Sequence, residues 1–120
     1  MNANEKKIII RFKEPAMMSQ FNEISPKLRA IICEIAWYSQ YKFGKVLIIT
    51  SLIRQDNKKS VHYYGRGGDL RVWHYTALQI QQIVNYVNRN YPYSRYRPWL
   101  KTCVYHDVGK GPHLHVQVSA

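Results

Sequence analysis

Two segments of the chain carry hydrophobic residues at the spacing of an α-helix. The first follows Ser25 and Pro26, which predict a helix start because a serine hydroxyl caps free backbone N–H groups and proline fits the first helical position. Gly44 predicts where this helix ends. Its apolar positions are Leu28, Ile31, Ile32 and Ile35. The second segment follows the capping residue Thr76, with apolar positions at Ala77, Ile80, Val84 and Val87.

Strand patterns account for much of the remaining chain. The run 45–53 is apolar and β-branched, which is typical of a buried strand. Residues 102–108 and 113–119 alternate in character and are separated by glycine and proline, which predicts a hairpin. A short extended segment and one further strand are expected at 8–13 and 69–74.

Two segments interrupt these patterns. Residues 54–68 contain charged residues and three glycines, and residues 88–101 are basic and aromatic, so both predict loops. The order of elements predicts a single domain over residues 1–120 with an α+β fold. We expect a mostly antiparallel sheet of about four strands with helices packed on one side.

The composition adds a strong positive charge to this picture. Against 7 acidic residues stand 18 lysine and arginine residues, which gives a formal net charge of +11. Such an excess serves solubility, electrostatic steering or an anionic partner. The sign of the charge alone does not distinguish nucleic acid, anionic lipid and anionic wall polymer.

The amino-terminal sequence and the cysteines indicate where the protein is made and whether it contains a disulfide. The apolar run near the amino terminus is too short for a signal peptide, and no stretch reaches transmembrane length. We therefore expect synthesis in the cytoplasm and no membrane partner. Cys33 and Cys103 lie in a helical and a strand pattern, which predicts two buried thiols, with a single disulfide as the alternative.

Four of the five histidines fall in two short groups. His113 and His115 point to the same face of a predicted strand, because successive side chains in a strand alternate faces. His62 and Asp69 frame a glycine-rich stretch that can fold back towards them. Neutral imidazoles and a carboxylate are zinc ligands, and a catalytic site uses three of them and leaves one position open.

These two groups resemble the motifs of a known enzyme family. The first resembles the Ser-x-His-x-x-Gly-x-Ala-x-Asp pattern of the zinc D-Ala-D-Ala carboxypeptidases and related peptidoglycan peptidases, which share the hedgehog/DD-peptidase fold; the matching residues are Ser60, His62, Gly65, Gly67 and Asp69. His113-Leu114-His115 is similar to the second motif of the His-x-His branch of this family. Thr50 to Arg54 resembles its Ser-Gly-Tyr-Arg strand end, so the likeness spans about residues 45–118.

The resemblance implies a role for each matching residue. His62, Asp69 and His115 are implied as zinc ligands, and His113 is implied as a catalytic group in proton transfer. Arg54 is implied to bind a substrate carboxylate or the developing oxyanion. The expected substrate side comprises Arg54, Ser60, Tyr96 and Trp99, the last two from a basic, aromatic loop whose rings can stack on sugars.

The expected function is therefore that of a zinc metallopeptidase that hydrolyses peptidoglycan stem peptides at the cell wall. We expect a monomer whose basic surface docks on anionic wall polymers. A wall-cutting activity without a signal peptide suggests a phage or viral lysis enzyme.

The chain departs from the family pattern in three places. Gly67 stands where the family has alanine, an exchange of small residues that we expect to matter little. Leu52 and Ile53 replace the Gly-Tyr pair before Arg54, and Pro112 stands where many members carry an acidic residue. The general base is consequently open between His113, Asp107 and His106.

Two other functions remain as alternatives. His-hydrophobic-His is also the metal motif of single-strand DNA nickases of the rolling-circle type, and the basic charge suits nucleic acid. Those enzymes place their nucleophilic tyrosine after the histidine pair, where this chain has none, and they do not account for His62 and Asp69. The other alternative is a non-catalytic basic protein that binds zinc, with His106 as a fourth ligand that closes the site.

Overall fold

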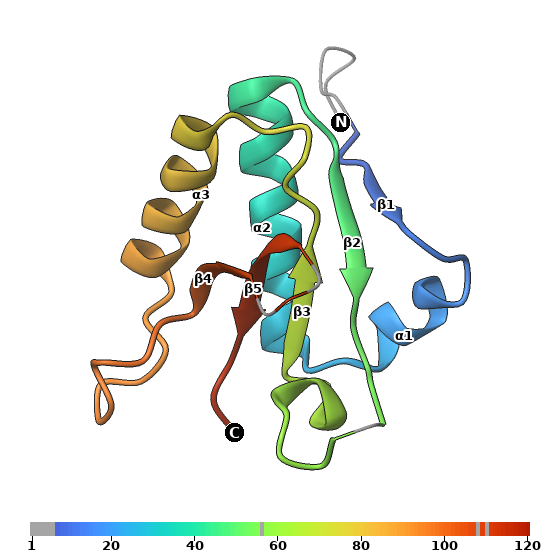
Figure 1. Cartoon of the computed structure of the whole chain (residues 1–120), viewed down its shortest axis with the longest axis vertical. Coiled ribbons are helices and arrows are strands. Elements are labelled where there is room, and N and C mark those ends of the chain that lie inside the picture. The colour runs from blue at the N-terminus through green and yellow to red at the C-terminus, as the bar shows by residue number, and fades with distance from the viewer. Residues whose placement is uncertain (1–6, 56, 108, 110) are drawn as a thin grey trace.

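One mixed sheet of five strands organises residues 7–55, 57–107, 109 and 111–120, the part of the chain that the computed structural model describes (Figure 1). Its strands are β1 (Ile10–Phe12), β2 (Leu47–Ser51), β3 (Gly67–Leu70), β4 (Cys103–Asp107) and β5 (Pro112–Gln117). Their order across the sheet is β1-β2-β3-β5-β4, so the closing hairpin β4–β5 docks on β3 through its second strand.

The α+β class is confirmed, but the expected sheet of about four strands is corrected to a mixed sheet of five. β1 pairs in parallel with β2, whereas the pairs β2–β3, β3–β5 and β4–β5 are antiparallel. The connection explains the parallel pair. Between β1 and β2 the chain passes through two helices, and such a crossover returns it to the same end of the sheet.

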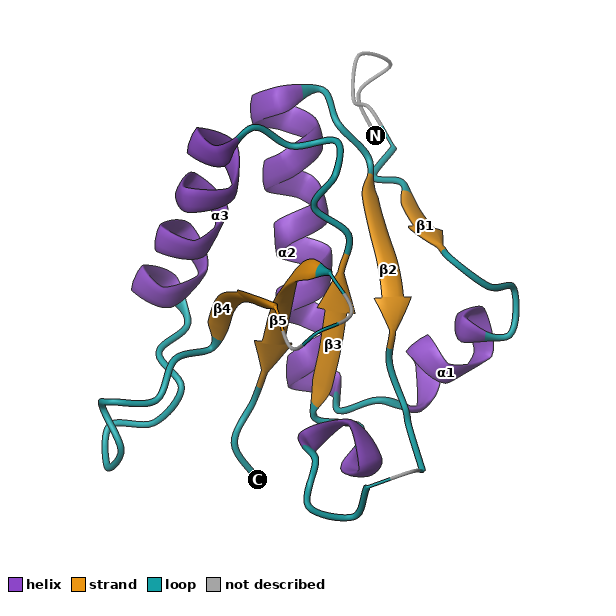
Figure 2. Cartoon of the chain, viewed as in Figure 1, coloured by secondary structure: helices purple, strands orange, loops and turns teal. Residues whose placement is uncertain are grey.

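Three α-helices accompany the described sheet: α1 (Met17–Glu23), α2 (Pro26–Phe43) and α3 (Ala77–Asn90) (Figure 2, purple). The predicted caps are present. The Ser25 side chain accepts from the Leu28 N–H, and Gly44 ends α2 in the left-handed conformation at φ 65°. Thr76 and Gln79 form a reciprocal capping box at the start of α3. The sequence did not predict α1, which has no side-chain cap and no fully buried residue.

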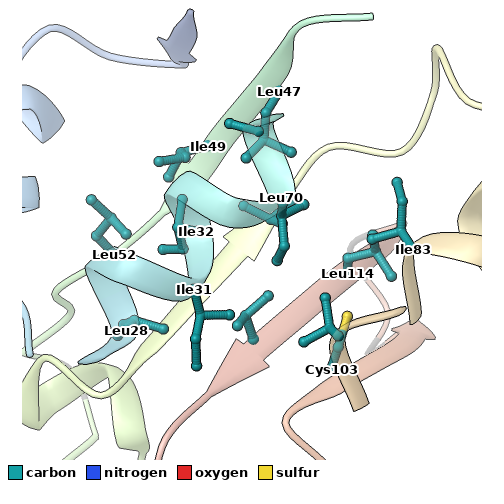
Figure 3. Packing of buried hydrophobic residues seen from close by; sticks show 14 of the residues in the cluster. Leu28, Ile31, Ile32, Leu47, Ile49, Leu52, Leu70, Ile83, Cys103 and Leu114 are labelled. Atoms are coloured by element: carbon teal, nitrogen blue, oxygen red, sulfur yellow. The ribbon is translucent and has the colours of Figure 1, made fainter. Parts of the chain in front are cut away.

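The core lies between the sheet and helices α2 and α3 (Figure 3). Alternate residues of the central strands point to this core, and they include Leu47, Ile49, Leu70, Leu114 and Val116. They meet the buried face of α2, formed by Leu28, Ile31, Ile32 and Ile35. Because side chains alternate along a strand, the residues between these apolar positions point to the opposite face of the sheet. Asp69, His113 and His115 are among them.

The strand expected at 69–74 lies earlier, at Gly67–Leu70. Its two glycines pair with Gln117 and Val116 of β5, so they are strand residues and not loop residues. A Cβ on Gly68 would lie 3.3 Å from Ile32 Cδ1 and 3.3 Å from Leu52 Cδ2. The predicted loop before it contains a 3₁₀ helix, η1 (Val61–Tyr64).

The cysteines differ in part from expectation. Both thiols are free, so no disulfide joins them. Cys103 is buried in the core as predicted, and burial raises the pKa of its thiol to about 12. The prediction that Cys33 is buried was wrong, because it lies on the exposed side of α2.

Candidate metal centre

Three imidazoles converge on one carboxylate oxygen on the sheet face opposite to α2 and α3. Asp69 Oδ1 lies 2.9 Å from His115 Nδ1, 3.2 Å from His62 Nε2 and 3.6 Å from His113 Nε2. The Asp69 side chain comes from β3, His113 and His115 from β5, and His62 from η1. In His62, Asp69 and His115 the candidate ligand atoms all lie within 4.8 Å of one another. These are the three ligands that the sequence resemblance implied.

The local structure around η1 fixes the position of His62. The Ser60 hydroxyl caps η1 by accepting from the His62 N–H, and Gly65 ends it with φ 68°. The imidazole is 1% exposed, and its Nδ1 lies 2.7 Å from the carbonyl oxygen of Leu52. A carbonyl only accepts, so Nδ1 carries the proton and donates it. Nε2 is therefore the free nitrogen, and it faces Asp69.

His115 is held in the same manner by its neighbour on β5. The Gln117 amide donates from Nε2 to the Lys101 carbonyl oxygen at 2.9 Å, so its oxygen faces His115. His115 Nε2 lies 3.1 Å from that oxygen and donates to it. His115 Nδ1 consequently offers a lone pair towards Asp69. Outer partners of this kind set the tautomer and the ring orientation of metal-binding histidines.

This arrangement fits a cation. His62 Nε2 is buried, lies 3.2 Å from a carboxylate oxygen and has no hydrogen-bond partner. Two lone pairs that face each other in a buried site repel unless a proton or a metal ion lies between them. Neutral imidazole nitrogens and one carboxylate are a ligand set suited to zinc. Neither described cysteine belongs to the cluster, whose candidate ligands are His62, Asp69 and His115.

The lowered pKa of Asp69 agrees with a site that binds a cation. Burial by itself raises the pKa of this carboxyl group. When His115 and His62 carry a proton on the nitrogen that faces Asp69, their hydrogen bonds and positive charges outweigh burial and hold the pKa of Asp69 far below its usual range. The carboxylate is therefore ionised at neutral pH and 7% exposed, as a metal ligand requires.

A second histidine pair lies beside the cluster. His106 on β4 is the register partner of His113 on β5, and their Nε2 atoms are 2.9 Å apart. His113 Nδ1 faces the Gly111 carbonyl oxygen at 3.4 Å, so His113 Nε2 is the acceptor and His106 Nε2 the donor. Burial, followed by the neighbouring His113 and His115, lowers the pKa of His106.

Asp107, the third candidate for the general base, has a different place. Its carboxylate accepts the backbone N–H groups of Gly109 and Gly111 at 2.8 and 3.1 Å. It therefore stabilises the turn between β4 and β5. Unlike His106 and His113, Asp107 does not belong to the described residues that line the cavity over the cluster.

A cavity of about 590 Å³ lies over the cluster. Two of the four predicted substrate-binding residues line it, and the other two do not. Arg54 and Ser60 line it. Tyr96 and Trp99 lie on the exposed loop between α3 and β4, and the structure does not bring them to the cavity. Sequence reasoning missed further lining residues, among them Lys13, Arg71 and Trp73. The alternation of a strand is a signal for Arg71, which follows Asp69 by two positions.

No protein-family model, curated protein or solved structure matches this chain, so the resemblance to zinc peptidases rests on its motifs. Within the described residues, no helix combines the length and the apolar character that a membrane crossing needs.

Proposed function

We propose that this protein is a zinc-dependent peptidase that hydrolyses the stem peptides of peptidoglycan. The orientation of His62 and His115 carries the proposal. Each ring donates one N–H to a fixed oxygen and directs its other nitrogen at the Asp69 carboxylate. Three such ligands at the base of a cavity favour a catalytic zinc site, because structural zinc sites close with a fourth protein ligand.

His62, Asp69 and His115 would hold a zinc ion, which would supply a water of pKa about 7 and polarise the carbonyl of the bond to be cut. His106 and His113 are the groups that move the proton. His113 Nε2 carries a lone pair that accepts the His106 N–H, and this lone pair can instead take the proton of the attacking water. That proton then passes to the leaving amine. His113 is suited to this role because its Nε2 lies only 3.6 Å from Asp69 Oδ1.

Arg54 supports the assignment of a peptide with a free carboxylate as substrate. It follows the end of β2, and its backbone N–H donates to the His62 carbonyl oxygen, which ties it to the cluster. Its guanidinium lines the cavity, and its buried Nε has no partner. A planar guanidinium fork matches a carboxylate in two parallel hydrogen bonds.

The choice of peptidoglycan rests on the motif resemblance and on charge. The net charge of +11 favours docking on anionic wall polymers, and this attraction weakens as salt rises. We place the site of action at the cell wall, in the setting of phage or viral lysis. Secretion of the protein by a standard export route, seen in cell fractionation, would contradict the lysis setting and leave the peptidase chemistry in place.

Metal content and wall-peptide cleavage, measured on the same samples, test the proposal. The wild type is expected to hold about one zinc per chain and to cleave purified muropeptides. His62→Ala and His115→Ala are expected to lose both. His74→Gln is the matched control, because His74 bonds the Val46 carbonyl oxygen outside the cluster.

Two results would contradict the proposal. Wild-type protein without stoichiometric metal would show that the two histidine motifs do not form a metal site. Zinc without cleavage of any muropeptide would overturn the peptidase assignment, and single-stranded DNA would then be the next substrate to test.

A further inference from the structure

The walls of the cavity carry far more positive than negative charge. Among the described residues that line it, Asp69 is the only acid, and the basic residues are Lys13, Arg54, Lys59 and Arg71. Every ion pair within the described part of the chain joins Asp69 to a histidine. No described carboxylate therefore neutralises these cations.

The two arginines lie on opposite sides of the metal cluster. Ser51 is the register partner of Asp69, and Arg54 continues beyond Ser51 in the direction of β2. Arg71 directly follows the end of the antiparallel strand β3, and its backbone N–H donates to the carbonyl oxygen of Ile48, which precedes Ser51. Arg54 and Arg71 thus extend from Asp69 in opposite directions along the sheet, and one chain bound across the cluster meets both.

Lys13 completes the Arg71 end of the cavity. Its backbone N–H donates to the Ile49 carbonyl oxygen, while Arg71 donates to Ile48, so the two residues flank β2 at neighbouring positions. Strands are about 4.8 Å apart, so both long side chains can reach an anion above β2.

The Arg71 guanidinium contacts Trp73, but one of its hydrogen-bond donors has no partner. Its Cζ lies 4.6 Å from the centre of the Trp73 ring, a cation–π contact that restricts where the side chain can move. Its Nε is buried and has no hydrogen-bond partner, as is the case for Arg54. A buried donor without a partner costs free energy unless a ligand satisfies it.

From this geometry we infer that Lys13 and Arg71 form a second carboxylate-binding subsite, on the side of the cleaved bond opposite to Arg54. The inference rests on the proposed peptidase function and defines its substrate. The preferred peptide carries an acidic residue on the amino-terminal side of the cleaved bond, in addition to the carboxylate that Arg54 binds on the other side. Lys13 and Arg71 then determine specificity and are not catalytic.

A pair of synthetic stem peptides tests this subsite. The two differ only in the acidic residue on the amino-terminal side, which is a free carboxylate in one and an amide in the other. With the zinc-loaded wild type, kcat/KM for the acid is expected to exceed that for the amide by about tenfold, the effect of one charge-assisted hydrogen bond. In Arg71→Gln and Lys13→Gln the ratio is expected to fall towards one.

Arg11→Gln is the matched control. It removes the same charge from the neighbouring strand β1, but Arg11 does not line the cavity. This variant is expected to keep the wild-type preference. A ratio near one in the wild type, or an unchanged ratio in Arg71→Gln, overturns the subsite and leaves the peptidase function standing.

Calorimetric binding of the same two peptides separates the two proposals if neither peptide is cleaved. The peptidase function then fails, and the subsite stands only if the acid binds more tightly than the amide in an Arg71-dependent manner. Equal affinities overturn it. A single-stranded oligonucleotide is the last probe. If it binds more tightly than the acidic peptide and loses this affinity in Arg71→Gln, the basic residues bind phosphate, and the carboxylate subsite is overturned.

Discussion

The carbonyl oxygen of Leu52 lies 2.7 Å from Nδ1 of His62, so the end of a core strand sets the tautomer of a candidate metal ligand. The Leu52 side chain is 1% exposed and packs in the core, while its backbone faces the histidine. Because the acceptor is a main-chain atom, this hydrogen bond does not depend on the side chain at position 52. Orientation of the ligand here depends on the backbone path.

The bond between Gln117 and His115 predicts an effect on metal affinity without loss of a ligand. Gln117→Leu removes the acceptor for His115 Nε2. Loss of such an outer partner lowers metal affinity by about 10–100-fold, and we expect a decrease of this size in competition with a chromogenic chelator. Gln82→Leu, the same change on the exposed side of α3, is the control. Equal affinities for both variants would show that Gln117 does not orient the ligand.

The hydrogen bond between His106 and His113 predicts that His113, and not Asp107, is the general acid–base group. His113→Gln is expected to keep bound zinc and to lower kcat by about 10²–10⁴-fold, the usual contribution of a general acid–base group. Asp107→Asn keeps an acceptor for the turn amides and is expected to leave kcat nearly unchanged. Kinetics with metal content measured in parallel distinguish the two. The reverse pattern would assign the base to Asp107.

The close surroundings of Gly67 predict that an alanine at this position lowers the stability of the protein. An added Cβ would lie 2.5 Å from Val61 Cγ2 and 3.3 Å from His115 Cε1, so alanine does not fit at this position unless Val61 shifts. Overpacking of this kind destabilises by about 1–3 kcal/mol, and we expect Gly67→Ala to lower the denaturant midpoint accordingly.

Val61→Ala in the same chain tests the cause of that cost. The double variant removes the clashing methyl group and is expected to recover part of the lost stability. A double variant no more stable than Gly67→Ala alone would trace the effect to the backbone and not to Val61.

The two thiols are expected to differ in reactivity. Cys33 is exposed and Cys103 is buried, so a thiol reagent should modify one cysteine of the native protein and the second only after unfolding. Cys33→Ser should remove the fast reaction completely. Rapid modification of the native Cys33→Ser variant would place Cys103 outside the core.

The raised pKa of Cys103 also predicts a loss of stability in alkali. Folding raises this pKa from its ordinary value of 9.0 to about 12, because burial disfavours the thiolate. The contribution to stability is fully present below pH 9.0 and is lost as the pH rises towards about 12. The unfolding free energy of wild type relative to Cys103→Ala should therefore decrease across this window. A constant difference would contradict the burial of the thiol.

The sequence by itself determined the features that depend on local chemistry. Ser25, Gly44 and Thr76 marked helix ends because capping acts within a few residues of the chain. The glycine and proline turn marked the β4–β5 hairpin for the same reason. The motif resemblance also singled out His62, Asp69 and His115, which the fold brings within 4.8 Å of one another.

Tertiary structure decided what depends on distant neighbours. The parallel pairing of β1, the strand position of Gly67 and Gly68, and the basic cavity wall of Lys13 and Arg71 follow from elements far apart in sequence. The outer partners of the histidines, the Leu52 carbonyl and the Gln117 amide, belong to this group too. The residue types in the sequence identify which side chains are able to bind a metal. Only the packed backbone determines which nitrogen of each histidine ring is free to bind it.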